Sequence, residues 1–150
     1  MNKEEQLTTG LRNLVHKMTR LNKPQMEACF REYLPSEVHC SEYIGRNEGL
    51  NVTKLADAFC MSIGAMSKIT TKLVEKGIIE SYQKPENRKE IYFQITEQGK
   101  RLNERHEELH KEFQLRDKAV FEQITPEEFD SMQRFVEKYC EHLDAEIKKL

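Results

Sequence analysis

Apolar residues recur every three or four positions near the start of the chain, which is the spacing of one helix face. Pro24 is expected to interrupt or bend this first helix, which would resume through Tyr33. Pro35 then opens a second helix that is predicted to end near Arg46. The stripe on the first helix has heptad-like spacing and consists of Leu7, Leu11, Leu14, Met18 and Leu21.

The middle of the chain predicts two helices joined by a tight turn. The first covers residues 54–59, with Leu55, Ala56 and Phe59 on its inner face. The second covers residues 63–76, with Ser62 as its N-cap and Gly77 at its end. Its inward positions are expected to be Ile63, Met66, Ile69, Leu73 and Val74, and its outward positions Ser67, Lys68, Thr71 and Lys72. This pattern is typical of a helix-turn-helix.

Two β-prone runs follow directly, at residues 78–82 and 91–95, and the polar, basic stretch 83–90 separates them. They predict a hairpin that would form the wing of a winged helix-turn-helix. Thr96 then caps a long helix, and Thr125 with Pro126 begins a last one. The apolar positions along these two helices are Leu102, Leu109, Phe113, Val120, Ile124, Phe129, Met132, Val136, Tyr139, Leu143, Ile147 and Leu150.

The predicted fold is therefore mainly α with a small β-hairpin. Residues 1–150 are expected to form a single domain, in which about 35–100 are the winged helix-turn-helix. A unit of this size cannot bury the apolar stripes of about 1–33 and 101–150, which are predicted to be dimerisation helices. A monomeric helical bundle is the alternative.

Composition narrows the class of protein. Charged residues make up 33% of the chain and apolar residues 37%, which favours a globular protein over a disordered or membrane-spanning one. No apolar stretch after Met1 resembles a secretory signal, so a cytoplasmic location is expected. The four cysteines are far apart and are predicted to be buried small hydrophobes in a reducing compartment; they are Cys29, Cys40, Cys60 and Cys140.

Charge is distributed unevenly. Residues 62–101 hold eight basic and five acidic side chains, a net charge of +3, although the whole chain carries -2. A basic middle segment is typical of a protein that presents one face to a polyanion. Double-stranded DNA is therefore the predicted partner. A winged helix used as a protein-docking module is the alternative.

The predicted DNA contacts divide between the recognition helix 63–76 in the major groove and the wing 83–90 in the minor groove. Lys68 is the best candidate to contact guanine, while Thr70, Thr71 and Lys72 would contact phosphates. Two copies would present two such helices about one DNA turn apart, which requires a pseudo-palindromic operator. The full set of predicted contacts is Ser62, Gly64, Ala65, Ser67, Lys68, Thr71, Lys72, Arg88 and Lys89.

Four segments carry a resemblance to the MarR family of winged helix-turn-helix regulators: residues 51–56, 62–68, 73–79 and 95–99. The resemblance implies a homodimeric transcriptional regulator, most often a repressor and not an enzyme, controlled by a small ligand, a metal or thiol oxidation. The family's wing usually has an aspartate before its arginine, whereas this chain has Asn87 before Arg88. The wing is therefore expected to keep its charge but to lose a carboxylate brace.

Residues 106–110 read His-Glu-Glu-Leu-His, which matches the HExxH pattern of zinc proteases. A metal-dependent hydrolase using His106, Glu107 and His110 is thus a remote alternative. No third ligand follows downstream, and the flanking residues are densely charged.

A second alternative is metal sensing. The chain is similar to zinc-responsive members of the family in having His39, His106 and His110 at comparable positions. The resemblance implies a fourth ligand, for which Glu27 and Cys29 are both candidates. That branch has glutamates where this chain has Val38 and Arg105, so its second metal site is expected to be absent. His106 also continues the Leu102–Leu109 face, and a buried, hydrogen-bonded histidine is the competing interpretation. No cofactor is certain, and Zn²⁺ is left open.

Overall fold

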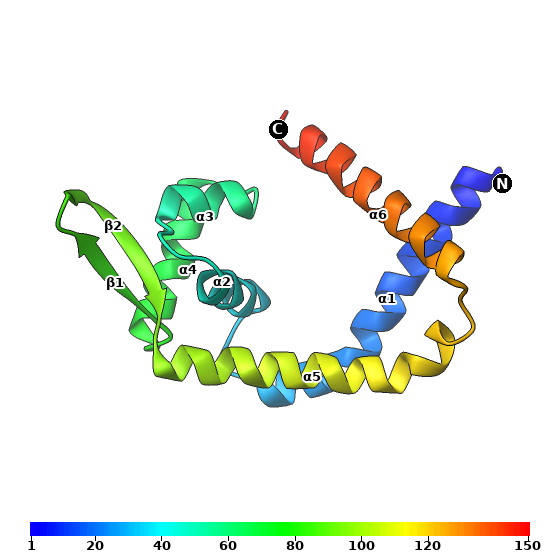
Figure 1. Cartoon of the computed structure of the whole chain (residues 1–150), viewed down its shortest axis with the longest axis horizontal. Helices are drawn as coiled ribbons and strands as arrows, with labels where there is room; N and C mark the ends of the chain where they lie inside the picture. The colour runs from blue at the N-terminus through cyan, green and yellow to red at the C-terminus, as the bar shows by residue number, and fades with distance from the viewer. The chain divides into compact units, whose positions relative to one another are not determined.

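The computed structural model describes residues 1–150 and contains six helices and one hairpin (Figure 1). The predicted class, mainly α with a small β-hairpin, is confirmed. The chain divides into two compact units, Met1–Leu34 and Pro35–Leu150. In chain order the elements are α1 (Lys3–Cys29), α2 (Pro35–Arg46), α3 (Val52–Ala58), α4 (Ile63–Glu75), β1 (Ile79–Lys84), β2 (Asn87–Ile95), α5 (Glu97–Phe121) and α6 (Pro126–Ile147).

The first unit is dominated by α1, which begins with a capping box between Asn2 and Glu5. Of the two effects expected of Pro24, an interruption or a bend, the interruption does not occur, because α1 continues through it to Cys29. A proline removes one backbone donor, and the remaining hydrogen bonds of a 27-residue helix outweigh that loss. No side chain of α1 is buried.

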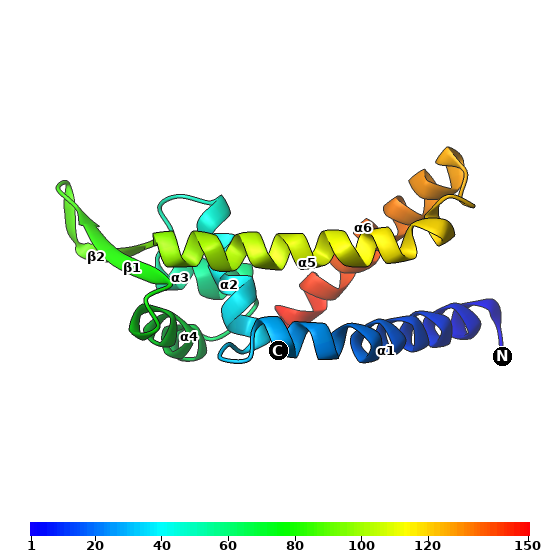
Figure 2. The same cartoon turned by 90° about the horizontal axis from the view of Figure 1, so that it is seen from below.

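The core of the second unit lies among α2, α3, α4, the hairpin and α5 as far as Phe113. In both views the hairpin and α4 lie at the same end of α5 (Figures 1 and 2). Burying these apolar side chains supplies the main stabilisation of the unit. The most completely buried are Val38, Cys40, Leu55, Met66, Leu73, Ile78 and Ile79.

A tight junction connects α4, the hairpin and α5. Gly77 ends the α4 segment with a φ of +75°, as predicted for a C-cap glycine. The Thr96 hydroxyl lies 2.6 Å from the Gly77 carbonyl oxygen and accepts a hydrogen bond from the Gly99 amide at 3.0 Å. A Cβ added to Gly99 would stand 2.2 Å from the Ile78 carbonyl oxygen. This close approach requires glycine.

The hairpin is longer than predicted, because β1 and β2 extend through most of residues 83–90. The two strands are antiparallel, with Tyr82 opposite Tyr92 and an irregularity between Tyr82 and Lys84. An isolated bridge from Leu50 to Phe93 adds a third backbone pairing beside them. The polar residues of the wing are therefore mostly strand residues, and the turn itself is short.

The cysteine prediction holds only for Cys40, whose burial raises its thiol pKa to about 12. Cys29 is half-buried, while Cys60 and Cys140 are exposed, and all four are free thiols. Cys60 has a φ of 52° in the turn between α3 and α4. Separately, none of the helices combines the length and the apolar character needed to cross a membrane.

Candidate nucleic-acid interface

Helix α4 presents one polar, exposed face. The Ser62 hydroxyl accepts a hydrogen bond from the Ala65 amide at 3.1 Å, which confirms Ser62 as the N-cap. The predicted outward side chains Ser67, Lys68, Thr71 and Lys72 are all exposed. Small residues, hydroxyls and two cations therefore face solvent together, with bare backbone at Gly64 at the start of the helix.

Three predictions about α4 are wrong. Ile63 and Val74, expected to face inward, are 54% and 41% exposed. Thr70, expected to contact phosphate, is 3% exposed, and its hydroxyl donates to the Ser67 carbonyl at 3.1 Å. Helical periodicity predicts a face only to within one residue, so the two positions at the edges of the stripe were assigned to the wrong side.

Two kinds of contact hold α4 in place. Met66 and Leu73 are fully buried. At the other end, the Lys76 ammonium donates to the Glu37 carboxylate on α2 at 2.8 Å, and the Glu37 side chain is only 3% exposed. Sequence patterning did not identify this pair, because a glutamate in the first turn of α2 is equally typical of a solvated helix start. The exposed face is thus carried on a rigid support.

The wing carries Arg88 and Lys89, both exposed, at the start of β2. Asn87 offers Arg88 no carboxylate, but its side chain holds the wing backbone in another way. The Asn87 side-chain oxygen accepts from the backbone amides of Lys89 and Glu90, each at 3.3 Å. Gln83 across the hairpin donates to the Arg88 carbonyl at 2.9 Å. Two side-chain amides therefore fix the backbone at the arginine and at the two residues after it.

Asn51 connects the helix-turn-helix to the wing. Its side-chain oxygen accepts from the Lys54 amide at 2.9 Å and caps α3. Its side-chain nitrogen donates to the Glu90 carboxylate on β2 at 3.2 Å. An asparagine before a short helix signals the cap, but nothing in the sequence indicates the second bond.

His106 and His110 form a hydrogen-bonded network with Glu42. His106 is buried, with Nδ1 against a Glu42 carboxylate oxygen and Nε2 3.0 Å from Nε2 of His110. The His39 ring lies edge-on to His106, with 6.1 Å between centroids. Partial burial lowers the pKa of His110, the charges of His106 and His39 lower it further, and Glu42 opposes them.

This arrangement does not support the two metal alternatives. No group of three or more histidine, cysteine, aspartate or glutamate side chains is placed to hold a metal ion. The proposed zinc ligands were His39, His106 and His110. Both ring nitrogens of His106 are engaged by other side chains of the protein. The Glu107 of the HExxH pattern is exposed and pairs with Lys111 at 3.3 Å. The structure agrees with the competing interpretation of a buried, hydrogen-bonded His106.

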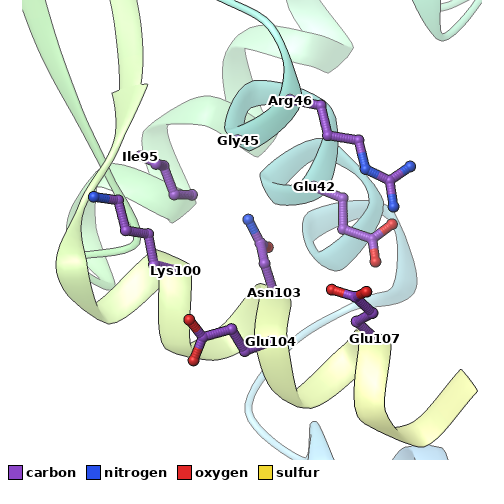
Figure 3. A pocket seen from close by; sticks show the side chains of 8 residues that line it. All are labelled: Glu42, Gly45, Arg46, Ile95, Lys100, Asn103, Glu104 and Glu107. Atoms are coloured by element: carbon purple, nitrogen blue, oxygen red, sulfur yellow. The ribbon is translucent and has the colours of Figure 1, made fainter. Parts of the chain in front are cut away.

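A pocket of about 250 Å³ lies between α2 and α5 (Figure 3). Its lining is mostly charged, and Glu42 and Glu107 extend toward it from the two helices. Part of the lining is already committed to the fold, since the Asn103 side chain accepts from the Ser41 hydroxyl at 2.7 Å. Ile95 is the one large apolar side chain of the lining, and the pocket indicates no ligand class.

Comparison with known proteins places the fold. Residues 35–91 match the model of the MarR family. The HTH-type transcriptional regulator PchR of Bacillus subtilis (strain 168) is 33% identical over 111 residues, which cover 74% of this chain and 66% of PchR. The uncharacterized HTH-type transcriptional regulator YhjH of the same organism is 34% identical over 93 residues, which cover 62% of this chain and 53% of YhjH. The chain therefore spans between half and two thirds of these relatives.

Among solved structures, Streptococcus pneumoniae FabT in complex with DNA superposes with a TM-score of 0.81. The match covers 95% of this chain and 99% of that one at 15% identity, which shows a shared fold. The wing and the helix-turn-helix described above lie within or beside the matched residues 35–91. The family-model match to residues 35–91 and the relatives named above identify the chain as a member of the MarR family of winged helix-turn-helix proteins.

Proposed function

We propose that this protein is a homodimeric, sequence-specific regulator of transcription that binds double-stranded DNA and acts as a repressor. Helix α4 would lie in the major groove, and the wing would reach the minor groove. The observation that carries the proposal is the joint exposure of Lys68, Lys72, Arg88 and Lys89 on α4 and the wing, at the same end of α5 (Figure 2). Because the partner is chromosomal DNA, a cytoplasmic location is part of the proposal.

Helix α4 and the wing would contact different parts of the DNA because their side chains differ. Small side chains at the start of α4 allow the helix to approach base edges, and Lys68 can donate to guanine. The hydroxyl of Thr71 and the ammonium of Lys72 suit phosphate oxygens, which fix the register without reading sequence. Arg88, held by the braced wing backbone, suits the negative potential of a narrow minor groove.

The dimer is supported by apolar stripes that the single chain leaves uncovered. None of the α6 side chains is buried, and the large apolar residues along this helix are 37–49% exposed. Exposed apolar surface of this extent marks an interface with another protein, and a two-fold dimer is the commonest arrangement. The uncovered α6 side chains are Phe129, Met132, Phe135, Val136, Tyr139, Leu143 and Ile147.

Salt-dependent DNA binding tests the proposal. A duplex enriched from a randomised pool by the full-length protein is titrated at several salt concentrations with the wild type and with Arg88→Ala. The slope of log affinity against log salt should fall by about 0.9 per lost phosphate contact, and binding should weaken on all duplexes alike. The matched control is Lys118→Ala on α5, an exposed lysine that pairs with Glu122 and should leave the slope unchanged.

Lys68→Ala tests base reading separately. Discrimination at one base pair of each half-site should relax by about 1–3 kcal/mol, while the salt slope changes little. If the purified protein enriches no duplex, or if Arg88→Ala binds with unaltered affinity at every salt concentration, the assignment of this surface to DNA is incorrect.

A further inference from the structure

Ile63 is one of the apolar residues that the core of the second unit leaves exposed. It is the first residue of α4, is 54% exposed, and contributes nothing to the buried core. Isoleucine is also a weaker helix former than alanine, leucine or the long polar residues. Met61, two residues earlier, is 38% exposed. An isolated exposed apolar side chain is ordinary, so its surroundings decide whether it has a role.

Those surroundings are the end of α4 that the proposed function places deepest in the major groove. The adjacent Gly64 has no side chain, and a Cβ built there would meet nothing within 4 Å. Ser67 lies one helical turn further along the same face and is small and exposed. The backbone at this end is therefore free to approach a base pair closely, with the Ile63 methyl groups projecting beside it.

The major groove offers one apolar group, the C5 methyl of thymine, and apolar side chains are its natural contact. Building on the proposed function, we infer that Ile63 is a specificity-determining residue that packs against a thymine methyl in each half-site. Polar neighbours on α4 read hydrogen-bonding edges, whereas Ile63 adds a preference that depends on a methyl group alone.

Replacing thymine by uracil tests this contact directly, because uracil lacks only that methyl. In the duplex enriched by the wild-type protein, each thymine is replaced by uracil in turn, and the Kd is measured by fluorescence anisotropy at fixed salt. At one position per half-site, uracil should weaken wild-type binding about fourfold, the factor expected for burying one methyl group. Ile63→Ala should bind the thymine and uracil duplexes equally at that position.

Val74→Ala is the matched control. Val74 is 41% exposed on the same helix, but it lies eleven residues further on, about 16 Å along the axis. This variant should keep the full sensitivity of the wild type to uracil. Ile63→Val, which retains a branched apolar side chain, should keep part of it. Since Ile63 is exposed, circular dichroism should show all three variants folded.

The outcomes separate this contact from the proposed function. If no duplex is enriched or bound, the DNA-binding function fails, and the thymine contact fails with it. A protein that binds its duplex but is indifferent to uracil at every position would overturn the contact alone. Equal weakening of all duplexes by Ile63→Ala, with a change in oligomeric state, would assign Ile63 to a protein–protein surface instead.

Discussion

The substitution Gly99→Ala is predicted to destabilise the second unit, because glycine allows α5 to approach the backbone of Ile78 closely. The added Cβ would stand 2.2 Å from the Ile78 carbonyl oxygen and 2.6 Å from Cδ1 of Ile95. The side chain can rotate, but the carbonyl belongs to the backbone and accepts from the Thr96 amide at 3.0 Å. The Thr96 hydroxyl also lies 2.9 Å from that carbonyl. Relief of the clash therefore requires α5 to move away from the base of the hairpin.

The expected cost follows from these contacts. Overpacking costs about 1–3 kcal/mol, and each weakened hydrogen bond adds about 1 kcal/mol. Alanine recovers at most about 1 kcal/mol, because it is a better helix former than glycine. We therefore expect Gly99→Ala to lower the free energy of unfolding by about 2–4 kcal/mol.

Urea unfolding followed by circular dichroism measures this change, with protein concentration held constant because a dimer's stability depends on it. The control is Gly64→Ala, also in the first turn of a helix, where an added Cβ meets nothing within 4 Å. That variant should be unchanged or slightly more stable. If Gly99→Ala unfolds within about 0.5 kcal/mol of the wild type, the close approach of α5 to Ile78 does not exist.

Three further changes probe other parts of the same unit. Lys76→Met should lower the free energy of unfolding by about 1–3 kcal/mol, because it leaves the buried Glu37 carboxylate without its ammonium partner. The cost is smaller than for a fully buried pair because the lysine is partly exposed. A Glu37→Leu/Lys76→Met double variant should unfold at higher urea than Lys76→Met alone. Thr96→Val keeps the shape but removes the N-cap oxygen of α5, and a thermal melt should show a loss of about 1–2 kcal/mol. The pKa of His110 is lower in the folded chain than in the unfolded chain. As pH falls below 6.5, the unfolded chain therefore binds a proton at His110 more readily than the folded chain does. Stability should therefore decline in that range, and the decline should be shallower in His110→Gln; an identical pH profile would contradict the lowered pKa.

Hydrophobic periodicity was sufficient for the element order, the wing and the caps at Ser62, Gly77 and Thr96, because these depend on neighbouring residues. Periodicity failed where contacts with distant parts of the chain decide whether a residue is buried or a helix continues. Ile63 lies at the edge of its helical stripe, and a shift of one residue exchanges core for solvent. Pro24 has a strong local signal for a break, yet the helix continues through it.

The contacts that sequence reasoning missed join residues far apart in the chain. Gln83 fixes the backbone at Arg88, and Glu42 engages His106 from another helix. Neither residue belongs to a local motif, so only the packed structure reveals its partner. The HExxH pattern shows the opposite error, a local motif whose residues the fold uses for other contacts.

The two bonds of the Asn51 side chain have a consequence for protein engineering. One amide group serves both α3 and β2, so the wing is tied to the helix that precedes α4. Exchange of residues 63–76 alone would leave both of these bonds in place, so such a hybrid should keep the wing in its position relative to α3. A hybrid that is to receive a new wing as well needs residues 50–95 exchanged together, because this segment keeps the Leu50–Phe93 bridge and both amide bonds.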